Sequence, residues 1–115
     1  MPLLQLAFWI FVAGAAGGGV LLALALMGRR PPAWSGPAHG LVGAAALATL
    51  GLGLARADEL FLLRQAGATA ALVATLAAGL FVSRLHFPGR EPLLMAIVHG
   101  SLAVLGLVLL YRIAF

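Results

Sequence analysis

Apolar residues occupy the chain in four long stretches, and short segments rich in charge, proline and glycine separate them. The stretches cover about residues 3–27, 32–55, 66–83 and 92–113. A helix needs about 20 apolar residues to cross the hydrocarbon layer of a membrane, which is about 30 Å thick. Each stretch has roughly this length, so the pattern predicts four transmembrane helices.

The connections between these predicted helices are short, and the longest is a charged segment at residues 56–64. We expect a loop there, with residues 58–64 as a short turn at the membrane surface. Lipid offers no hydrogen-bond partners, so every spanning backbone group must bond within its own helix. The sequence therefore predicts an all-α integral membrane protein, a four-helix up-down-up-down bundle with a single transmembrane domain over residues 1–115.

The composition excludes most soluble classes. The chain is 63% hydrophobic and 9% charged, whereas a soluble domain is about 45–50% apolar and about 25% charged. It has no Cys, which excludes a disulfide scaffold and a cysteine-based metal centre, and no Lys, which excludes a lysine Schiff base and a P-loop. The net charge of +4 comes from scattered arginines, so we expect a lipid bilayer as partner and no nucleic acid.

Arginines also bear on orientation, because cytoplasmic loops carry an excess of positive charge. The two sides of the predicted bundle differ by one arginine: Arg29, Arg30, Arg84 and Arg90 on one, Arg56, Arg64 and Arg112 on the other. This difference places both termini in the periplasm. The Ala/Leu/Arg-rich composition is typical of GC-rich bacteria, so the expected location is the bacterial inner membrane.

A shift of 60 residues aligns the two halves of the chain and brings their rare residues into register. Both halves contain the pattern R-x-P-x6-H-G, and Gly19 aligns with Gly79. The aligned residues are Arg30, Pro32, His39 and Gly40 in the first half, and Arg90, Pro92, His99 and Gly100 in the second. The repeat predicts two similar helical hairpins, at about residues 6–55 and 66–115, related by a pseudo-two-fold axis along the membrane normal.

His39 and His99 each lie seven residues after the aligned proline, which is about 10 Å along a helix. Both therefore enter the hydrocarbon to a similar depth, where an ionisable side chain faces the bundle interior and has a partner. That partner is the other histidine, a metal, water or a proton or substrate path, or polar groups including those of a neighbouring subunit. If the second helix instead begins at Ser35, which then caps it, His39 is shallower than His99 and the two do not share one metal ion.

Two neutral imidazoles on facing helices are the axial ligand set of a low-spin haem iron. We expect His39 and His99 to be these ligands, and haem b to be the cofactor. Gly40 and Gly100 give the macrocycle clearance, Gly43 and Ala103 leave a slot one helical turn further on, and Arg30 and Arg90 neutralise the propionates at the membrane boundary.

This arrangement resembles the membrane four-helix b-type cytochromes, which hold haem between histidines of two helices and exchange electrons with quinone. The membrane anchors of succinate and fumarate dehydrogenases and the cytochrome b561-like proteins are examples. The resemblance rests on His39, His99, Gly40 and Gly100. It implies a small electron-transfer subunit that works with quinone or a membrane partner. Bacteriochlorophyll is an alternative tetrapyrrole, with one pigment on each histidine.

The main alternative function is a non-catalytic accessory subunit of a larger respiratory or photosynthetic complex, in which the histidines only form hydrogen bonds. Glycine and alanine fill residues 13–19 and predict a smooth helix surface for other membrane subunits or a second copy, as in a homodimer. His86 aligns with no histidine and is assigned a surface role. Small multidrug exporters have a similar size but need a glutamate in the first helix, and residues 6–27 contain no acid.

Overall fold

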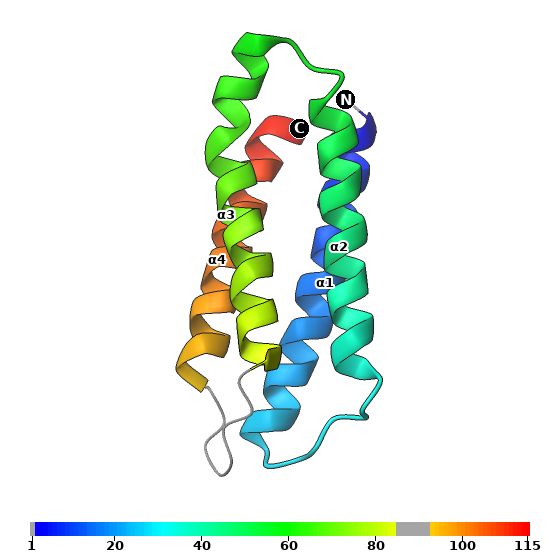
Figure 1. Cartoon of the computed structure of the whole chain (residues 1–115), viewed down its shortest axis with the longest axis vertical. Helices are drawn as coiled ribbons and strands as arrows, with labels where there is room; N and C mark the ends of the chain where they lie inside the picture. Colours follow the sequence, from blue (N-terminus) through cyan, green and yellow to red (C-terminus); the bar gives the residue numbers. More distant parts are fainter. Residues whose placement is uncertain (1, 85–92) are drawn as a thin grey trace.

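Four α-helices form the protein in the computed structural model, which describes residues 2–84 and 93–115 (Figure 1). The helices are α1 (Pro2–Leu26), α2 (Ser35–Leu54), α3 (Glu59–Arg84) and α4 (Leu93–Ala114). No β-strand occurs in these residues. The structure therefore confirms the predicted all-α fold with four helices.

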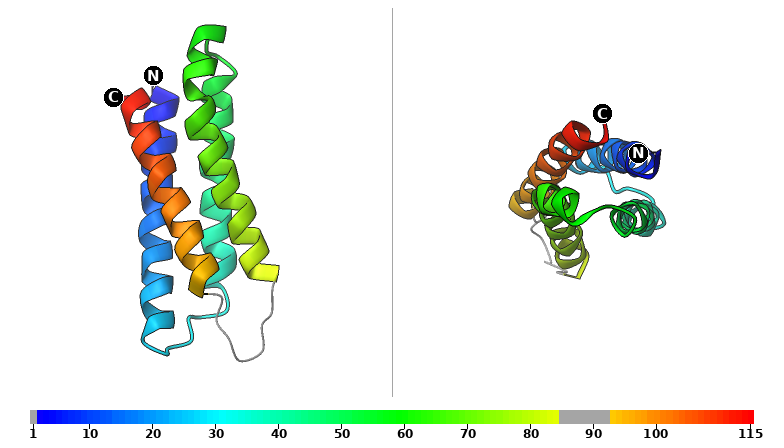
Figure 2. Two further views of the ribbon diagram at one scale, coloured as in Figure 1. Left: turned by 90° about the vertical axis from the view of Figure 1, so that its left-hand side faces the viewer. Right: turned by 90° about the horizontal axis from the view of Figure 1, so that it is seen from above.

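The helices lie side by side in an elongated bundle that measures 48 × 20 × 19 Å. Seen along its axis, the bundle is a square in which α1 and α3 each lie beside both α2 and α4 (Figure 2). The pairs α1–α3 and α2–α4 are therefore diagonally opposite. Both termini and the α2–α3 connection lie at one end, here called the terminal end, and the α1–α2 connection lies at the other, here called the loop end (Figure 1).

Helix α3 is longer than predicted, because it begins at Glu59 instead of near Ala66. The segment that we expected to form a loop and a surface turn is therefore helical from Glu59 onward. Charge alone does not break a helix, and Leu, Glu, Arg and Gln all have good helix propensity. Glu59 lies in the first turn, where an acidic side chain interacts favourably with the helix dipole.

Helix α2 begins at Ser35, as the alternative interpretation of the sequence proposed, and not at Pro32. The N-cap is Trp34, which makes no side-chain capping bond. The Ser35 hydroxyl and the Ser35 backbone N–H both donate to the Pro32 carbonyl, at 2.6 and 3.0 Å. Pro32 disfavours helical geometry in the residue before it, whereas Pro37 is tolerated in the first turn of α2, where no intrahelical N–H bond is lost.

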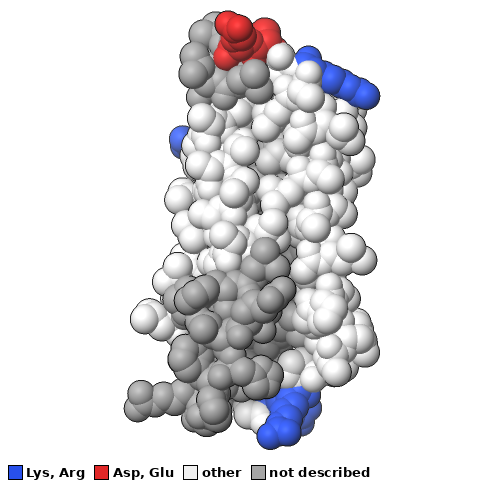
Figure 3. Space-filling view, viewed as in Figure 1, with Lys and Arg blue, Asp and Glu red and all other residues white. Residues whose placement is uncertain are grey.

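Within the described part of the chain, three helical segments are long and apolar enough to cross a membrane: Pro2–Leu26, Ser35–Leu54 and Ala96–Ala114. In α3 the apolar segment Gln65–Gly79 is shorter. On the face shown in Figure 3, the described charged side chains lie toward the two ends of the molecule, one of them at the left edge below the top, and the described surface between them is uncharged. Exposed large apolar side chains on that surface include Val20, Leu41, Val73, Val104 and Val108. This distribution is compatible with residence in a membrane.

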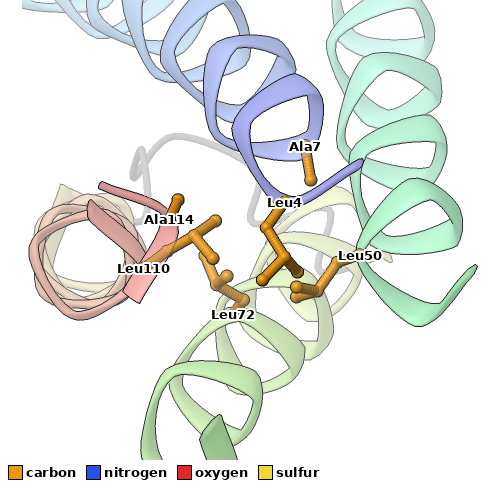
Figure 4. Packing of buried hydrophobic residues seen from close by; sticks show 6 residues of the cluster. All are labelled: Leu4, Ala7, Leu50, Leu72, Leu110 and Ala114. Carbon is orange, nitrogen blue, oxygen red and sulfur yellow. The ribbon is translucent and has the colours of Figure 1, made fainter. Parts of the chain in front are cut away.

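The apolar core lies toward the terminal end and takes one leucine from each helix: Leu4, Leu50, Leu72 and Leu110 (Figure 4). Glycines allow two of these leucines to pack closely against a neighbouring helix. A Cβ added at Gly53 lies 2.9 Å from Leu4 Cδ2, and one added at Gly106 lies 2.6 Å from Leu72 Cδ2. The predicted haem ligands lie nearer the loop end, so the core and the candidate site occupy different levels of the bundle.

Candidate functional site: a histidine pair between the helices

His39 of α2 and His99 of α4 meet inside the bundle. Their ring centroids are 6.0 Å apart and the ring planes make an angle of 79°. Because α2 and α4 are diagonally opposite, the two imidazoles reach across the centre of the square. Both side chains are half-buried. The structure thus brings together the two residues that the sequence predicts as metal ligands.

The late start of α2 does not separate the pair, although the alternative interpretation expected that it would. Helix α4 is described from Leu93 onward. His39 is four residues past Ser35 and His99 is six past Leu93, a difference of two residues or about 3 Å of helix. The two histidines therefore stay at nearly the same depth.

Each imidazole lies against a glycine of the preceding helix. A Cβ added at Gly18 of α1 lies 2.9 Å from His39 Cε1, and one added at Gly79 of α3 lies 2.9 Å from His99 Cε1. Carbon atoms in ordinary contact are about 3.5–4.0 Å apart, so only glycine lets the rings approach this closely. Sequence reasoning did not assign this role, and it aligned Gly79 with Gly19, whereas the structural counterpart is Gly18.

A backbone carbonyl lies near each ring, one helical turn before the glycine. His99 Nδ1 is 2.8 Å from the Thr75 carbonyl oxygen. Because a carbonyl only accepts, His99 donates from Nδ1 and its Nε2 keeps a free lone pair in the neutral imidazole. The His39 ring interacts with the backbone of Gly14. His39 Nδ1 nevertheless has no hydrogen-bond partner among the described residues, so the two halves of the pair are not equally satisfied.

The predicted cofactor-binding residues beside the histidines differ in exposure, and the glycines among them have free space around them. No described atom lies within 4 Å of a Cβ added at Gly40, Gly43 or Gly100. Gly40 is exposed, whereas Gly43, Gly100 and Ala103 are half-buried. The glycines that make room for the imidazoles are therefore Gly18 and Gly79, while the glycine after each histidine borders open space.

The predicted propionate partners lie toward the loop end, in part beyond the described chain. Arg30 belongs to the α1–α2 connection and its side chain is exposed. Arg90 and His86 lie outside the described residues. Only the first half of the predicted arginine pair can therefore be placed.

The pair offers two ligands and no more. Among the described residues, no group of three His, Cys, Asp or Glu side chains is placed to hold a metal ion. A metal bound by protein side chains alone usually takes three or four of them, whereas a tetrapyrrole supplies four nitrogens and leaves only axial positions for the protein. The described residues therefore bring two imidazoles together without a third potential ligand of these types.

Comparisons with protein-family models, curated proteins and solved structures found no match for this chain.

Proposed function

We propose that the protein is a small membrane-embedded b-type cytochrome, an electron-transfer subunit that holds one haem between His39 and His99. The observation that carries this proposal is the 6.0 Å between the ring centroids. A histidine nitrogen binds a transition metal at about 2 Å, so the centroid of its ring lies about 3 Å from the metal. Two histidines on opposite sides of one metal therefore have ring centroids about 6 Å apart. The centroid separation of His39 and His99 is close to this value, so these two residues would hold such a metal between them.

The hydrogen bond of His99 supports this role. Metal-binding histidines almost always donate their second ring nitrogen to a carbonyl or carboxylate, which fixes the tautomer and the ring orientation. The Thr75 carbonyl accepts such a bond from His99 Nδ1 at 2.8 Å. Nε2 of His99 is then the nitrogen available for iron.

The residues that contact the two imidazoles from α1 and α3 are small, which lets the rings lie close to the helix backbones. The bundle presents Gly14 and Gly18 from α1, and Thr75 and Gly79 from α3, to the two rings. A macrocycle held by both imidazoles would extend toward α1 and α3, because the ligands come from the other diagonal of the square. The separation of 6.0 Å also supports one shared tetrapyrrole over two bacteriochlorophylls, which together need more space.

We further infer that four helices cross the membrane in up-down-up-down order and that the two hairpins are pseudo-repeats. Residues 41–50 and 101–110 show the same order of exposed, half-buried and buried positions. Each histidine also lies on a glycine of the preceding helix. The arginine distribution supports an orientation with the loop end in the cytoplasm of a bacterial cell and both termini in the periplasm.

When bound, haem accepts and donates one electron at a time. His39 and His99 bind and orient it, and the apolar side chains of the four helices exclude water from it. Arg30 is the described residue for a propionate at the loop end, and Arg90 has the equivalent place in the sequence repeat. A single haem does not carry an electron across the whole membrane, so we expect quinone and a second membrane subunit or copy as partners.

The test is a spectrum of the protein purified in mild detergent from cells supplied with haem. We expect a dithionite-reduced minus oxidised difference spectrum of a b-type haem. His39→Ala and His99→Ala should each abolish the six-coordinate haem, and His86→Ala should retain it as the control. A colourless wild-type preparation, or equal loss in all three variants, contradicts the proposal.

A second candidate function is a non-catalytic accessory subunit. The contacts of the two histidines with their protein neighbours favour it. His99 bonds to Thr75 and the two rings touch edge to face, so protein neighbours provide part of what a buried histidine requires. In that case His99→Ala lowers the thermal stability of the protein and no preparation contains haem.

A further inference from the structure

Gln65 is a buried polar residue whose side chain makes no hydrogen bond within the described part of the chain. It lies near the terminal end of α3 and is 1% exposed. Both amide atoms, Nε2 and Oε1, lack a hydrogen-bond partner among the described residues. A buried amide without partners costs free energy, and such groups in native proteins are rare. Gln65 therefore points to a partner that the described residues do not supply.

The other glutamine of the protein, Gln5, has a hydrogen-bond partner and joins two helices. The sequence has two glutamines, Gln5 and Gln65, separated by the 60-residue repeat. Gln5 Nε2 donates to the Ala114 carbonyl at 3.1 Å and so joins α1 to the last turn of α4. The corresponding position at the end of α2 is Leu54, and Gln65 makes no such bond to it. The α2–α3 pair is also less extensively packed than the α1–α4 pair.

Thr69 adds a second unused polar group one helical turn from Gln65. Its Oγ1 is buried and has no hydrogen-bond partner within the described part of the chain. The other two threonines satisfy their hydroxyls within their own helices, Thr49 on the Ala45 carbonyl at 2.9 Å and Thr75 on the Ala71 carbonyl at 2.8 Å. Residues four apart on a helix are neighbours on one side, so Gln65 and Thr69 offer their free groups together.

We propose that Gln65 and Thr69 form a second binding site, for the head group of a neutral, lipid-soluble molecule that carries carbonyl or hydroxyl groups, the class of quinones and quinols. A ligand carbonyl accepts from Gln65 Nε2 or the Thr69 hydroxyl, and a ligand hydroxyl donates to Gln65 Oε1. The site thus serves both the oxidised and the reduced form. The buried face of α3 at this level, Gln65, Ala68 and Leu72, carries no charge to pair with an ionic ligand.

This inference rests on the proposed electron-transfer function for the identity of the ligand, and it assigns to that function a place for quinone. Thr75, whose carbonyl accepts the bond from His99, follows Thr69 by six residues on the same helix. That interval is about 9 Å along the axis. The two sites therefore lie at successive levels of α3.

The first experiment measures binding of decylubiquinone to the full chain in quinone-free phosphatidylcholine nanodiscs, with empty nanodiscs as the blank. Gln65→Leu and Thr69→Val remove the free polar groups and keep the approximate volume. We expect each variant to bind decylubiquinone at least about tenfold more weakly, because each loses one or two buried hydrogen bonds to the ligand. The matched controls Gln5→Leu and Thr49→Val should bind within about twofold of wild type.

The inference is overturned if the wild type shows no saturable binding, if Gln65→Leu binds as the wild type does, or if Gln5→Leu weakens binding equally. If only water occupies the site, Gln65→Leu binds decylubiquinone as the wild type does. The failure of the haem proposal looks different: haem is then absent, while quinone binding still depends on Gln65. Conversely, a normal haem spectrum together with an unaffected Gln65→Leu variant overturns this inference only.

A second measurement needs no ligand. Without quinone, Gln65→Leu should raise the midpoint of thermal unfolding, because it removes a buried amide that has no partner. Gln5→Leu should lower the midpoint, because it removes the bond to Ala114. A lowered midpoint for Gln65→Leu would show that the amide is satisfied inside the protein and would overturn the inference.

Discussion

Gly18 and Gly79 set the distance between each imidazole and its neighbouring helix. A Cβ at either position lies 2.9 Å from the histidine Cε1, well inside the contact distance of about 3.5 Å between carbon atoms. The rings are part-buried and His99 is fixed by its bond to Thr75, so they have little freedom to move aside. These two glycines therefore position the histidines that we assign to haem.

Gly18→Ala and Gly79→Ala should each displace an imidazole. We expect a loss of about 1–3 kcal/mol in stability from overpacking, together with loss or weakening of the haem spectrum. Gly19→Ala is the matched control, since no described atom lies within 4 Å of a Cβ there. It should be neutral or stabilising by up to about 1 kcal/mol, because alanine is the better helix former. Thermal unfolding and haem absorbance measure both effects, and equal behaviour of Gly18→Ala and Gly19→Ala contradicts this role.

The residue pattern predicts part of this site and not the rest. The repeated spacing from proline to histidine predicts that His39 and His99 lie at a similar depth, and the rings do meet. The glycines under the rings were not predicted. Residues 13–19 are all glycine or alanine, so the sequence gives no reason to choose Gly18 over Gly17 or Gly19. The rotation of α1 against α2 makes that choice, and it is a property of the packed bundle.

At the scale of elements, apolar length predicts three of the helices within a few residues and fails for the start of α3. The sequence between Arg56 and Arg64 contains charges and no apolar stripe long enough to span a membrane. Helix propensity is independent of that requirement, and residues 59–64 contain neither glycine nor proline. Helix α3 therefore extends beyond the apolar segment from which it was predicted.

The packing of α3 on α4 depends on Gly106. A Cβ there lies 2.6 Å from Leu72 Cδ2, whereas one at Gly43 on α2 meets no described atom within 4 Å. We expect Gly106→Ala to destabilise the protein by about 1–3 kcal/mol and Gly43→Ala to leave the apo-protein stable. Adding Leu72→Ala should recover part of the Gly106→Ala loss in thermal unfolding. Additive losses in the double variant would show that the two residues are not coupled.

At the scale of the whole molecule, the described charges and the exposed apolar side chains lie at different levels of the bundle. Arg29 and Arg30 belong to the α1–α2 connection at the loop end, whereas Arg56 belongs to the α2–α3 connection and Arg112 to the last turn of α4, both toward the terminal end. Val104, Val108 and other apolar side chains are exposed between these levels. Trp9, Tyr111 and Phe115 are exposed near the terminal end. Aromatic residues at such a level are typical of a membrane–water interface.

The proposed orientation is open to labelling, because the chain contains no cysteine. In spheroplasts, a membrane-impermeant maleimide should label Ala57→Cys, in the α2–α3 connection, without permeabilisation. Ala33→Cys, in the α1–α2 connection, should react only after the membrane is opened. The reverse result would place the termini in the cytoplasm. Labelling of both positions from outside would contradict the crossing of the membrane by α2.

The most direct test of the histidine pair is low-temperature electron paramagnetic resonance of the oxidised, haem-loaded protein. Two histidine ligands to one ferric haem give a low-spin signal, and ring planes at 79° predict a strongly anisotropic one. His39→Ala and His99→Ala should each convert it to a high-spin signal or remove it. A haem that is high-spin in the wild type, or that stays low-spin in either variant, contradicts the assignment of His39 and His99 as its axial ligands.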